Sequence, residues 1–317
     1  MKSVVVLSGV HKSFGEVKAL QGVDLEVAEG EIFGFLGPNG AGKTTTLRIL
    51  TTLLPLERGE ARVAGCCVKG DPQGVRKSIG YVSQKGGADK NGTGFENLVL
   101  QGRLYGLGKG DASKKAQELV ASFALEECVG RMVSTYSGGQ RRRLDIALAM
   151  MHAPKVLFLD EPTTGLDPQS RDNLWSKILQ LKEGGMTIFL TSHYLDEVDA
   201  LADSLAIMDH GRVVARGTPG EMKKQISGDI IAIGVHKELH ERVIALFENR
   251  PPFLREIVVE EEHLRLYVDR GPSALPQIMR LLDQAEVKLE TIQMSVPSLQ
   301  DVFLKKTGRS LRDEVRQ

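Results

Sequence analysis

The stretch GPNGAGKT at positions 37–44 constrains this chain more than any other part of its sequence. It fits the pattern GxxxxGK[ST], follows an apolar run at 33–36 and opens a segment with helical spacing. Glycines let backbone N–H groups surround a phosphate, and the N-terminus of the following helix adds positive dipole charge. We therefore expect an α/β protein in which Lys43 contacts the β- and γ-phosphates of a nucleotide and Thr44 binds Mg²⁺. The nucleotide-binding residues expected in this loop are Gly37, Pro38, Asn39, Gly40, Ala41, Gly42, Lys43, Thr44 and Thr45.

Length and charge balance exclude several classes of protein. A chain of 317 residues is long enough for two domains. Its 41 Lys and Arg are matched by 41 Asp and Glu, so it lacks the basic excess of a nucleic-acid binder, and we expect no nucleic-acid partner. The 3 Cys favour a reducing compartment. No uncharged apolar run reaches the ~18 residues that a membrane span needs, and no signal peptide is evident, so a role at a membrane would require a second chain that spans it.

Two adjacent carboxylates end a strongly apolar segment. Residues 156–159 are continuously apolar, as in a central parallel strand covered on both faces, and Asp160 and Glu161 follow directly. A strand of this kind places Asp160 at its end, where the carboxylate can coordinate a metal ion. Glu161 comes one residue later, where it can polarise an attacking water. Adjacent acids are also common where ordinary strands end. The pair indicates a nucleotide site only in combination with the loop at 37–44.

Ser137, Gly138, Gly139 and Gln140 precede a helix, and Arg141–Arg143 follow them. This arrangement has two interpretations. It is a helix cap followed by a solvated basic turn, or it is a second anion-binding cup at a helix N-terminus. Because one loop already holds a triphosphate, a second cup would serve a nucleotide that another subunit holds.

Taken together, these motifs resemble the ATP-binding cassette (ABC) ATPases. By this resemblance, residues 37–44 of this chain correspond to the family's Walker A motif, residues 137–140 to its signature and residues 156–160 to its Walker B motif. The resemblance covers about residues 3–220, and the minor motifs occur in the family's order. It departs from the family at Tyr136, where Leu is usual, and in the polar stretch 85–94, which would face a membrane partner. The other residues that the resemblance assigns are the adenine-stacking Phe14, the Q-loop Gln84, the D-loop Asp167 and the switch His193.

The resemblance implies a fold and a mechanism. The fold is a P-loop NTPase of ABC type, with a mixed sheet core, an antiparallel β subdomain and a helical subdomain at about 95–152. Two subunits, identical or paired, form a head-to-tail dimer in which each ATP lies between one Walker A motif and the other subunit's signature. The implied catalytic residues are Glu161, His193 and Lys43, the implied Mg²⁺ ligands are Thr44, Gln84 and Asp160, and Ser137, Gly138, Gly139, Gln140 and Asp167 act across the interface.

Local patterns predict the elements of this first domain. The opening is expected to be rich in hairpins, and an edge hairpin is expected near its end. The predicted strands are 4–7, 23–27, 32–36, 62–63, 79–82, 156–159, 187–190, 205–208 and 212–215; the predicted helices are 44–53, 96–105, 113–123, 140–151 and 168–182.

A second domain is expected over residues 221–317. Its pattern reads strand 230–235, helix 238–248, strands 257–259 and 264–268, helix 273–284 and strand 287–294, the βαββαβ order of ferredoxin-like domains. A last helix is expected at 299–306. The segment 296–309 resembles the tail of daunorubicin-resistance-type ABC exporter ATPases. That resemblance implies a separate membrane permease and a location on the cytoplasmic face of the membrane. The second domain contains no catalytic constellation, so we expect it to stabilise the dimer or to regulate it.

Several alternative functions remain open at this point. Soluble ABC proteins of translation carry two cassettes, whereas this chain has one. Repair-type proteins insert a long coiled coil between Walker A and signature, and no heptad run occurs here. Importer ATPases for sugars carry a longer, all-β extension. A non-catalytic cassette is disfavoured by intact Lys43, Asp160, Glu161 and His193. We therefore expect an exporter ATPase that moves a drug, lipid or peptide.

Overall fold

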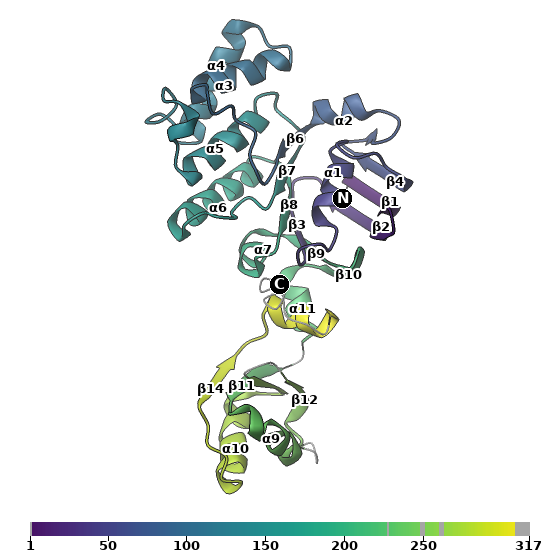
Figure 1. Cartoon of the computed structure of the whole chain (residues 1–317), viewed down its shortest axis with the longest axis vertical. Helices are drawn as coiled ribbons and strands as arrows, with labels where there is room; N and C mark the ends of the chain where they lie inside the picture. The colour runs from purple at the N-terminus through teal and green to yellow at the C-terminus, as the bar shows by residue number, and fades with distance from the viewer. Residues whose placement is uncertain (1, 227, 248–250, 260–262, 308–317) are drawn as a thin grey trace. The chain divides into compact units, whose positions relative to one another are not determined.

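The computed structural model describes residues 2–226, 228–247, 251–259 and 263–307 (Figure 1). The chain divides into two compact units at Pro219 and Gly220. Each unit is described by itself.

In the described part of the first unit, a six-stranded sheet has the order β10-β9-β3-β8-β7-β6. Every neighbouring pair is parallel except β9 and β10, which are antiparallel. The central strands are buried along their whole length, as parallel strands covered on both faces must be. The strands are β3 (Ile32–Leu36), β6 (Ile79–Val82), β7 (Val156–Asp160), β8 (Thr187–Ser192), β9 (Ser204–Asp209) and β10 (Arg212–Gly217).

A second, antiparallel sheet has the order β2-β1-β4-β5 in the described residues. Its first two strands form one long hairpin, β1 (Ser3–Phe14) and β2 (Val17–Ala28), beside β4 (Arg58–Val63) and β5 (Cys66–Cys67). The prediction of short strands in a hairpin-rich opening was wrong in two respects. The hairpin strands are longer, because pairing extends them through polar positions, and the strand at 32–36 belongs to the parallel sheet.

Helices lie on both faces of the six-stranded sheet. Helix α1 (Lys43–Leu50) contacts β2, β4 and β7, so it fills the space between the two sheets. Helix α7 (Leu195–Leu201) contacts β3 and β8, and α6 (Pro168–Glu183) packs against α7. Two short helices, α7 and α2 (Pro72–Ser78), were not predicted, since seven residues carry too little periodicity to recognise.

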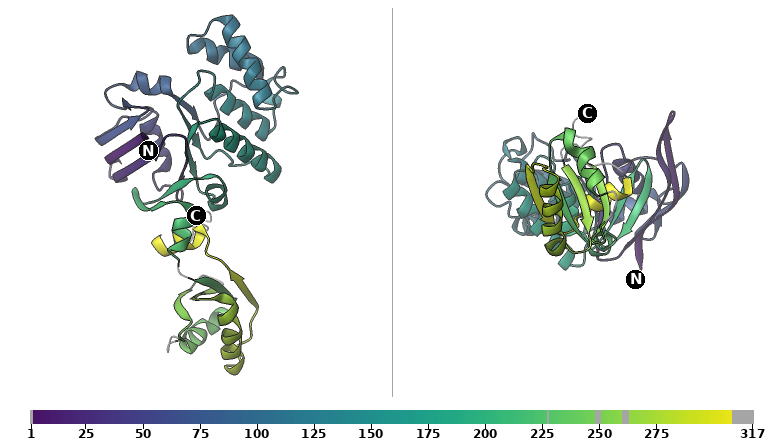
Figure 2. Two further views of the ribbon diagram at one scale, coloured as in Figure 1. Left: turned by 180° about the vertical axis from the view of Figure 1, so that it is seen from behind. Right: turned by 90° about the horizontal axis from the view of Figure 1, so that it is seen from below.

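A helical segment separates β6 from β7 in the chain. It contains α3 (Gly94–Leu104), α4 (Lys109–Ser122), η1 (Val133–Thr135) and α5 (Gly138–Ala149). Figures 1 and 2 show this segment and the antiparallel sheet on opposite sides of the six-stranded sheet. Capping boxes fix the starts of α3 and α5, each two residues before the predicted start. Tyr136, the departure from the family pattern, is buried and donates its hydroxyl to Cys128 O over 2.7 Å.

The described part of the second unit has an antiparallel sheet of order β12-β13-β11-β14. This is the strand order that the predicted ferredoxin-like βαββαβ arrangement requires. Helix α10 contacts β11, β14 and α9, and their apolar residues form one core. A short helix, α8 (Pro219–Lys224), lies at the start of the unit and was not predicted. The elements are β11 (Asp229–Gly234), η2 (Lys237–Leu239), α9 (His240–Leu246), β12 (Leu254–Val259), β13 (His263–Val268), α10 (Gly271–Gln284), β14 (Thr291–Ser295) and α11 (Leu299–Thr307).

Candidate active site

The loop at 37–42 joins β3 to α1 in a conformation that demands glycine. Gly42, the N-cap of α1, has φ 109°, and a Cβ there would lie 2.7 Å from Ala19 O. At Gly37 a Cβ would lie 2.4 Å from Met208 O. Among the described residues no side chain caps the N-terminus of α1, and its first turn has no acidic residue. The first N–H groups of this helix therefore suit an anion such as a phosphate.

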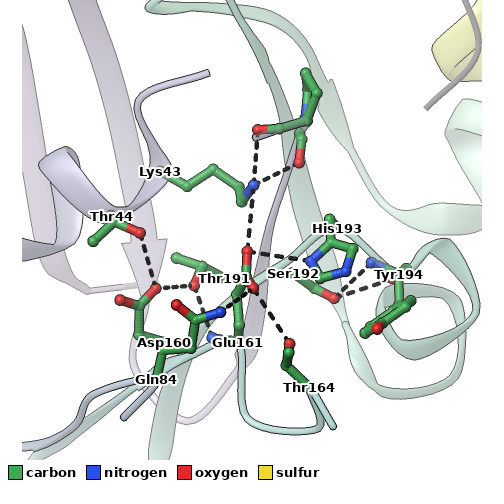
Figure 3. A network of polar contacts seen from close by, with 12 residues as sticks. Lys43, Thr44, Gln84, Asp160, Glu161, Thr164, Thr191, Ser192, His193 and Tyr194 are labelled. Atoms are coloured by element: carbon green, nitrogen blue, oxygen red, sulfur yellow. Dashed lines mark hydrogen bonds and ion pairs between the residues drawn. The ribbon is translucent and has the colours of Figure 1, made fainter. Parts of the chain in front are cut away.

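Lys43 is held inside this loop. Its Nζ donates to Gly37 O over 2.6 Å and to Pro38 O over 2.9 Å, and lies 3.7 Å from Glu161 Oε1 (Figure 3). The side chain is only 4% exposed. The cationic end of Lys43 thus lies between the backbone of the loop and a carboxylate at the end of β7.

Asp160 binds two hydroxyl groups at the carboxyl ends of the strands. Its Oδ1 accepts from Thr191 Oγ1 over 2.7 Å and from Thr44 Oγ1 over 3.3 Å. A buried carboxylate beside a hydroxyl is a hard oxygen donor set, which Mg²⁺ prefers. In the part of the chain that the structure describes, no three His, Cys, Asp or Glu side chains gather as a metal-binding cluster. The Asp160 carboxylate and the Thr44 hydroxyl fit an ion that takes the rest of its shell from a nucleotide and water, as Mg²⁺ does.

Glu161 is the centre of the polar network in Figure 3. Its Oε2 accepts from Gln84 Nε2 over 3.0 Å and from Thr164 Oγ1 over 3.3 Å. His193 Nδ1 lies 3.2 Å from Oε1, in a close contact that is not an aligned hydrogen bond. Burial raises the pKa of Glu161, but the His193 ring, Lys43 and Thr164 outweigh burial and hold that pKa below its ordinary value. The carboxylate is therefore kept in its ionised form.

The backbone at Glu161 has φ 46°. A non-glycine residue with positive φ is uncommon, and such residues concentrate at functional sites. The conformation aims the Glu161 side chain at Lys43 and His193 rather than along β7. Its N–H donates to O and Oγ1 of Thr191, each over 3.1 Å, which anchors the turn to β8.

A buried network supports the loop that carries His193. Ser192 Oγ donates to Glu197 Oε2 over 2.6 Å and accepts from Tyr194 N over 2.9 Å. Trp175 Nε1, on α6, donates to Glu197 Oε1 over 3.4 Å. Burial raises the pKa of Glu197, whereas donors such as Ser192 lower it without cancelling that effect. Sequence reasoning missed Glu197, because its partners lie on another helix and at the end of β8.

Arg142 was also missed, since the basic triplet 141–143 was interpreted as a solvated turn or as part of an anion cup. The side chain of Arg142 is instead buried, and all its hydrogen bonds run to backbone carbonyls. A signal was present in the sequence. Arg142, Asp145, Ile146 and Ala149 follow the i, i+3, i+4, i+7 spacing of one helix face.

The signature residues lie outside the network around Glu161. Ser137 Oγ accepts from Gln140 N over 3.2 Å, and Gln140 Oε1 accepts from Ser137 N over 3.1 Å, which closes a capping box on α5. The D-loop Asp167 caps α6 in a similar way, through Ser170 N at 2.9 Å and Ser170 Oγ at 2.6 Å. These bonds to Ser170 lower the pKa of Asp167.

The structure therefore brings together part of the expected site. Lys43, Thr44, Gln84, Asp160, Glu161 and His193 meet at the carboxyl ends of β3, β7 and β8. Phe14 lies apart from them at the tip of the β1–β2 hairpin, 48% exposed, with Lys12 Nζ 5.5 Å from its ring centre.

A glycine-rich anion loop between a parallel strand and a helix, with an acidic strand end beside it, defines a P-loop NTPase. The chain matches the ABC transporter family over residues 20–164 and the ATP-binding protein DrrA1-3-like C-terminal domain over 217–307. The chain belongs to the ATP-binding proteins of ABC transporters, and it is an ATPase. The fold class predicted from the motifs is thereby confirmed.

Relatives match along nearly the whole chain. It is 44% identical to the daunorubicin resistance ATP-binding protein DrrA2 of Streptomyces coeruleorubidus, covering 94% of this chain and 93% of the relative. It is 35% identical to the Nod factor export ATP-binding protein I of Ralstonia nicotianae, covering 98% and 95%. Among solved structures it resembles a post-hydrolysis dimer of the ATP-binding cassette MJ0796 bound to ADP and Pi. That match has 26% identity and a TM-score of 0.62 and covers 68% of this chain and 98% of the other.

Among the residues that the structure describes, no helix combines the length and apolar character that crossing a bilayer requires.

Proposed function

We propose that this chain is the ATP-hydrolysing subunit of a bacterial exporter and powers efflux of a drug, lipid or peptide through a separate permease. The observation that carries the proposal is the network in which Lys43, Asp160 and Glu161 converge at one sheet edge. The direction of transport is supported by relatives named for daunorubicin, doxorubicin and linearmycin resistance and for Nod factor export. It is also supported by the match of the second unit to a DrrA1-3-like C-terminal domain.

ATP would be held by the loop at 37–42 and the N-terminus of α1, where uncapped N–H groups are available. Lys43 would move from the loop carbonyls to the β- and γ-phosphates, which are stronger acceptors. Thr44, Gln84 and Asp160 would hold Mg²⁺, which neutralises charge on the phosphate oxygens when bound. Phe14, exposed at the hairpin tip, would stack on adenine.

Glu161 would act on the attacking water. Because its pKa is lowered by His193, Lys43 and Thr164, despite burial, the carboxylate is ionised at neutral pH and can accept a hydrogen bond or a proton. Gln84 donates to one carboxylate oxygen of Glu161 and His193 lies beside the other, so the carboxylate would orient the water as well as polarise it. Phosphoryl transfer needs mainly this kind of positioning and charge stabilisation.

The remaining expected residues would act between subunits. Ser137, Gly138, Gly139 and Gln140 form the N-terminus of α5 away from their own Walker A network, so their donors would face a nucleotide held by a second subunit. Asp167, at the start of α6, would organise the same interface. The partner for the dimer is a second copy or a related ATPase.

A cavity of about 320 Å³ lies beside the Q-loop and would receive a cytoplasmic segment of the permease. It is lined by β6, the Q-loop and helices α3 and α5, including Tyr81, Gly86, Tyr105, Leu148 and His152. A segment that docks there touches the loop carrying Gln84, which hydrogen-bonds Glu161. Binding of the permease segment in this cavity would therefore affect Glu161 through Gln84.

Trapping the complex tests the proposal. Glu161→Gln protein, loaded with ATP in its native host, is purified from detergent-solubilised membranes, and its partners are identified by mass spectrometry. A polytopic membrane protein in stoichiometric amount is expected. The matched control, Lys43→Ala in the same background, should lose that partner's ATP-dependent enrichment. Recovery of only ribosomal or DNA-repair proteins would overturn the transport role while leaving the ATPase site intact.

A further inference from the structure

The guanidinium of Arg142 touches three parts of the chain at once. This residue lies in α5 and is 5% exposed. Its Nε donates to Pro162 O over 2.8 Å, one terminal nitrogen donates to Ser83 O over 2.7 Å, and the other donates to Asp160 O over 2.9 Å. Every nitrogen of one rigid, planar group is therefore bonded to a different backbone carbonyl.

The three carbonyls belong to residues that adjoin Glu161 and Gln84 in the chain. Asp160 and Pro162 are the neighbours of Glu161 on either side, and Ser83 precedes Gln84, which donates to Glu161 Oε2. Glu161 itself has φ 46°, a conformation that a non-glycine residue keeps only when its surroundings enforce it. Arg142 holds the peptide group that precedes Glu161, through Asp160 O, and the peptide group that follows Pro162, through Pro162 O, so it restrains the turn before and after this residue.

We propose that Arg142 is a positioning residue for hydrolysis: its three carbonyl bonds fix the backbone of Glu161 and Gln84, and thereby fix the carboxylate relative to the attacking water. A lysine could not replace it, because one compact ammonium cannot reach three carbonyls that a planar fork spans. The role is distinct from that proposed for residues 137–140, which begin the same helix and would contact a nucleotide held by a second subunit. Arg142 thus connects helix α5 to the turn that carries Glu161 in the same subunit.

The contacts of Arg142 explain why a buried charge is tolerated here. Desolvation lowers the pKa of Arg142, while Asp145, Asp160 and Glu197 oppose that effect. An arginine stays charged in proteins, and a buried charge is stable only when its donors are satisfied.

The test compares Arg142→Lys with Ile146→Val, a mild change on the same helix that removes no polar contact. We expect Arg142→Lys to lower kcat about 100-fold, the scale of a misplaced catalytic group, while the KM for ATP changes less than about threefold. In a Glu161→Gln background, the same change should lower single-turnover hydrolysis less than about twofold, because its effect passes through Glu161. Ile146→Val should leave kcat and KM near wild type.

Three outcomes would overturn the proposal: an unchanged kcat in Arg142→Lys, a rise in KM with kcat preserved, or an equal loss of hydrolysis in the Glu161→Gln background. The inference rests on the proposed role of Glu161, and Glu161→Gln alone tests that role. If Glu161→Gln hydrolyses ATP at the wild-type rate, the proposed function of Glu161 fails. If it is inactive but Arg142→Lys is fully active, only the role of Arg142 fails.

Hydrogen exchange on the full chain gives a second readout if Arg142→Lys folds poorly in the activity assay. Arg142→Gln should speed amide exchange at residues 82–87 and 158–164, on both sides of the lost contacts, while Ile146→Val should not. Unchanged protection of both segments would contradict the restraint that the geometry assigns to Arg142.

Discussion

Glu197 Oε2 accepts a hydrogen bond from Ser192 Oγ over 2.6 Å, and this buried bond fixes the residue that precedes His193. The other carboxylate oxygen of Glu197 accepts from Trp175 Nε1 on α6. One side chain therefore connects the end of β8, which carries His193, to the helix that Asp167 caps.

Replacing Glu197 should disturb His193 without touching the nucleotide. Glu197→Ala removes the acceptor of two donors, Ser192 Oγ and Trp175 Nε1. It is expected to lower the free energy of unfolding by about 1–3 kcal/mol and to lower kcat more than ATP affinity. Glu197→Gln keeps an acceptor and should be milder. Trp175 is the only tryptophan of the chain, so its fluorescence reports the loss directly. An unchanged emission in Glu197→Ala would contradict the contact.

The lowered pKa of Glu161 predicts how stability depends on pH. Burial raises this pKa, but His193, Lys43 and Thr164 together lower it below 4.5. The folded protein therefore prefers the ionised carboxylate more than the unfolded chain does, and this contribution is present above pH 4.5. It should disappear as the pH falls through the lowered pKa. Urea unfolding of wild type and Glu161→Gln, at neutral pH and in acid, should show a difference that shrinks with acidification.

The reverse trend, a difference that grows in acid, would mean that burial dominates the carboxylate. Thr164→Ala serves as the control, because it removes one weak donor, at 3.3 Å, and leaves Lys43 and His193 in place. It should reduce the pH dependence only in part.

The sequence predicts the features that neighbouring residues determine and misses those that depend on partners distant in the chain. The apolar run that ends in Asp160 predicts β7 because a central parallel strand imposes apolar residues on both faces. The loop at 37–44 predicts its own conformation because its glycines and the following helix are adjacent in sequence. The length of β1 depended instead on its antiparallel partner β2, which no local window contains.

The polar side chains show the same division. Lys43 and Asp160 were recognisable as a pair because each belongs to a contiguous motif. Arg142 and Glu197 were not, because the carbonyls that Arg142 contacts, and the Trp175 donor to Glu197, are distant from them in the sequence. A charged residue on the apolar face of a predicted helix, as at Arg142, is the one signal that could have revealed such a role.

The glycines of the phosphate loop should differ in their tolerance. At Gly40, with φ 79°, a Cβ would meet no atom within 4 Å, so Gly40→Ala suffers backbone strain of about 1–2 kcal/mol only. At Gly42 the same strain is joined by a clash with Ala19 O. We expect Gly42→Ala to lose ATP binding and Gly40→Ala to retain most of it, as measured by calorimetric titration. Equal loss in both variants would show that strain alone decides.

Mixing two inactive variants tests the head-to-tail dimer. Ser137→Ala removes the hydroxyl of the signature, at a cost in helix capping of about 1 kcal/mol. Lys43→Ala removes the cationic side chain of the Walker A motif. Each homodimer should hydrolyse little ATP. In a mixed dimer, one site combines the intact Lys43 of one subunit with the intact Ser137 of the other. An equimolar mixture should therefore recover roughly a quarter of wild-type activity if dimers form at random and sites act independently.

The activity expected of the mixture depends on which subunit supplies Ser137 to each nucleotide. If Ser137 acted on the ATP of its own subunit, every site in the mixture would lack either Lys43 or Ser137, and mixing would restore nothing. Folding defects cannot imitate the expected gain, since a mixture of two unfolded variants gains no activity. A matched mixture of Lys43→Ala with Glu161→Gln should remain inactive, because both residues belong to the same subunit's network and every site lacks one of them. Recovery in the first mixture and not in the second is therefore the result that head-to-tail assembly requires.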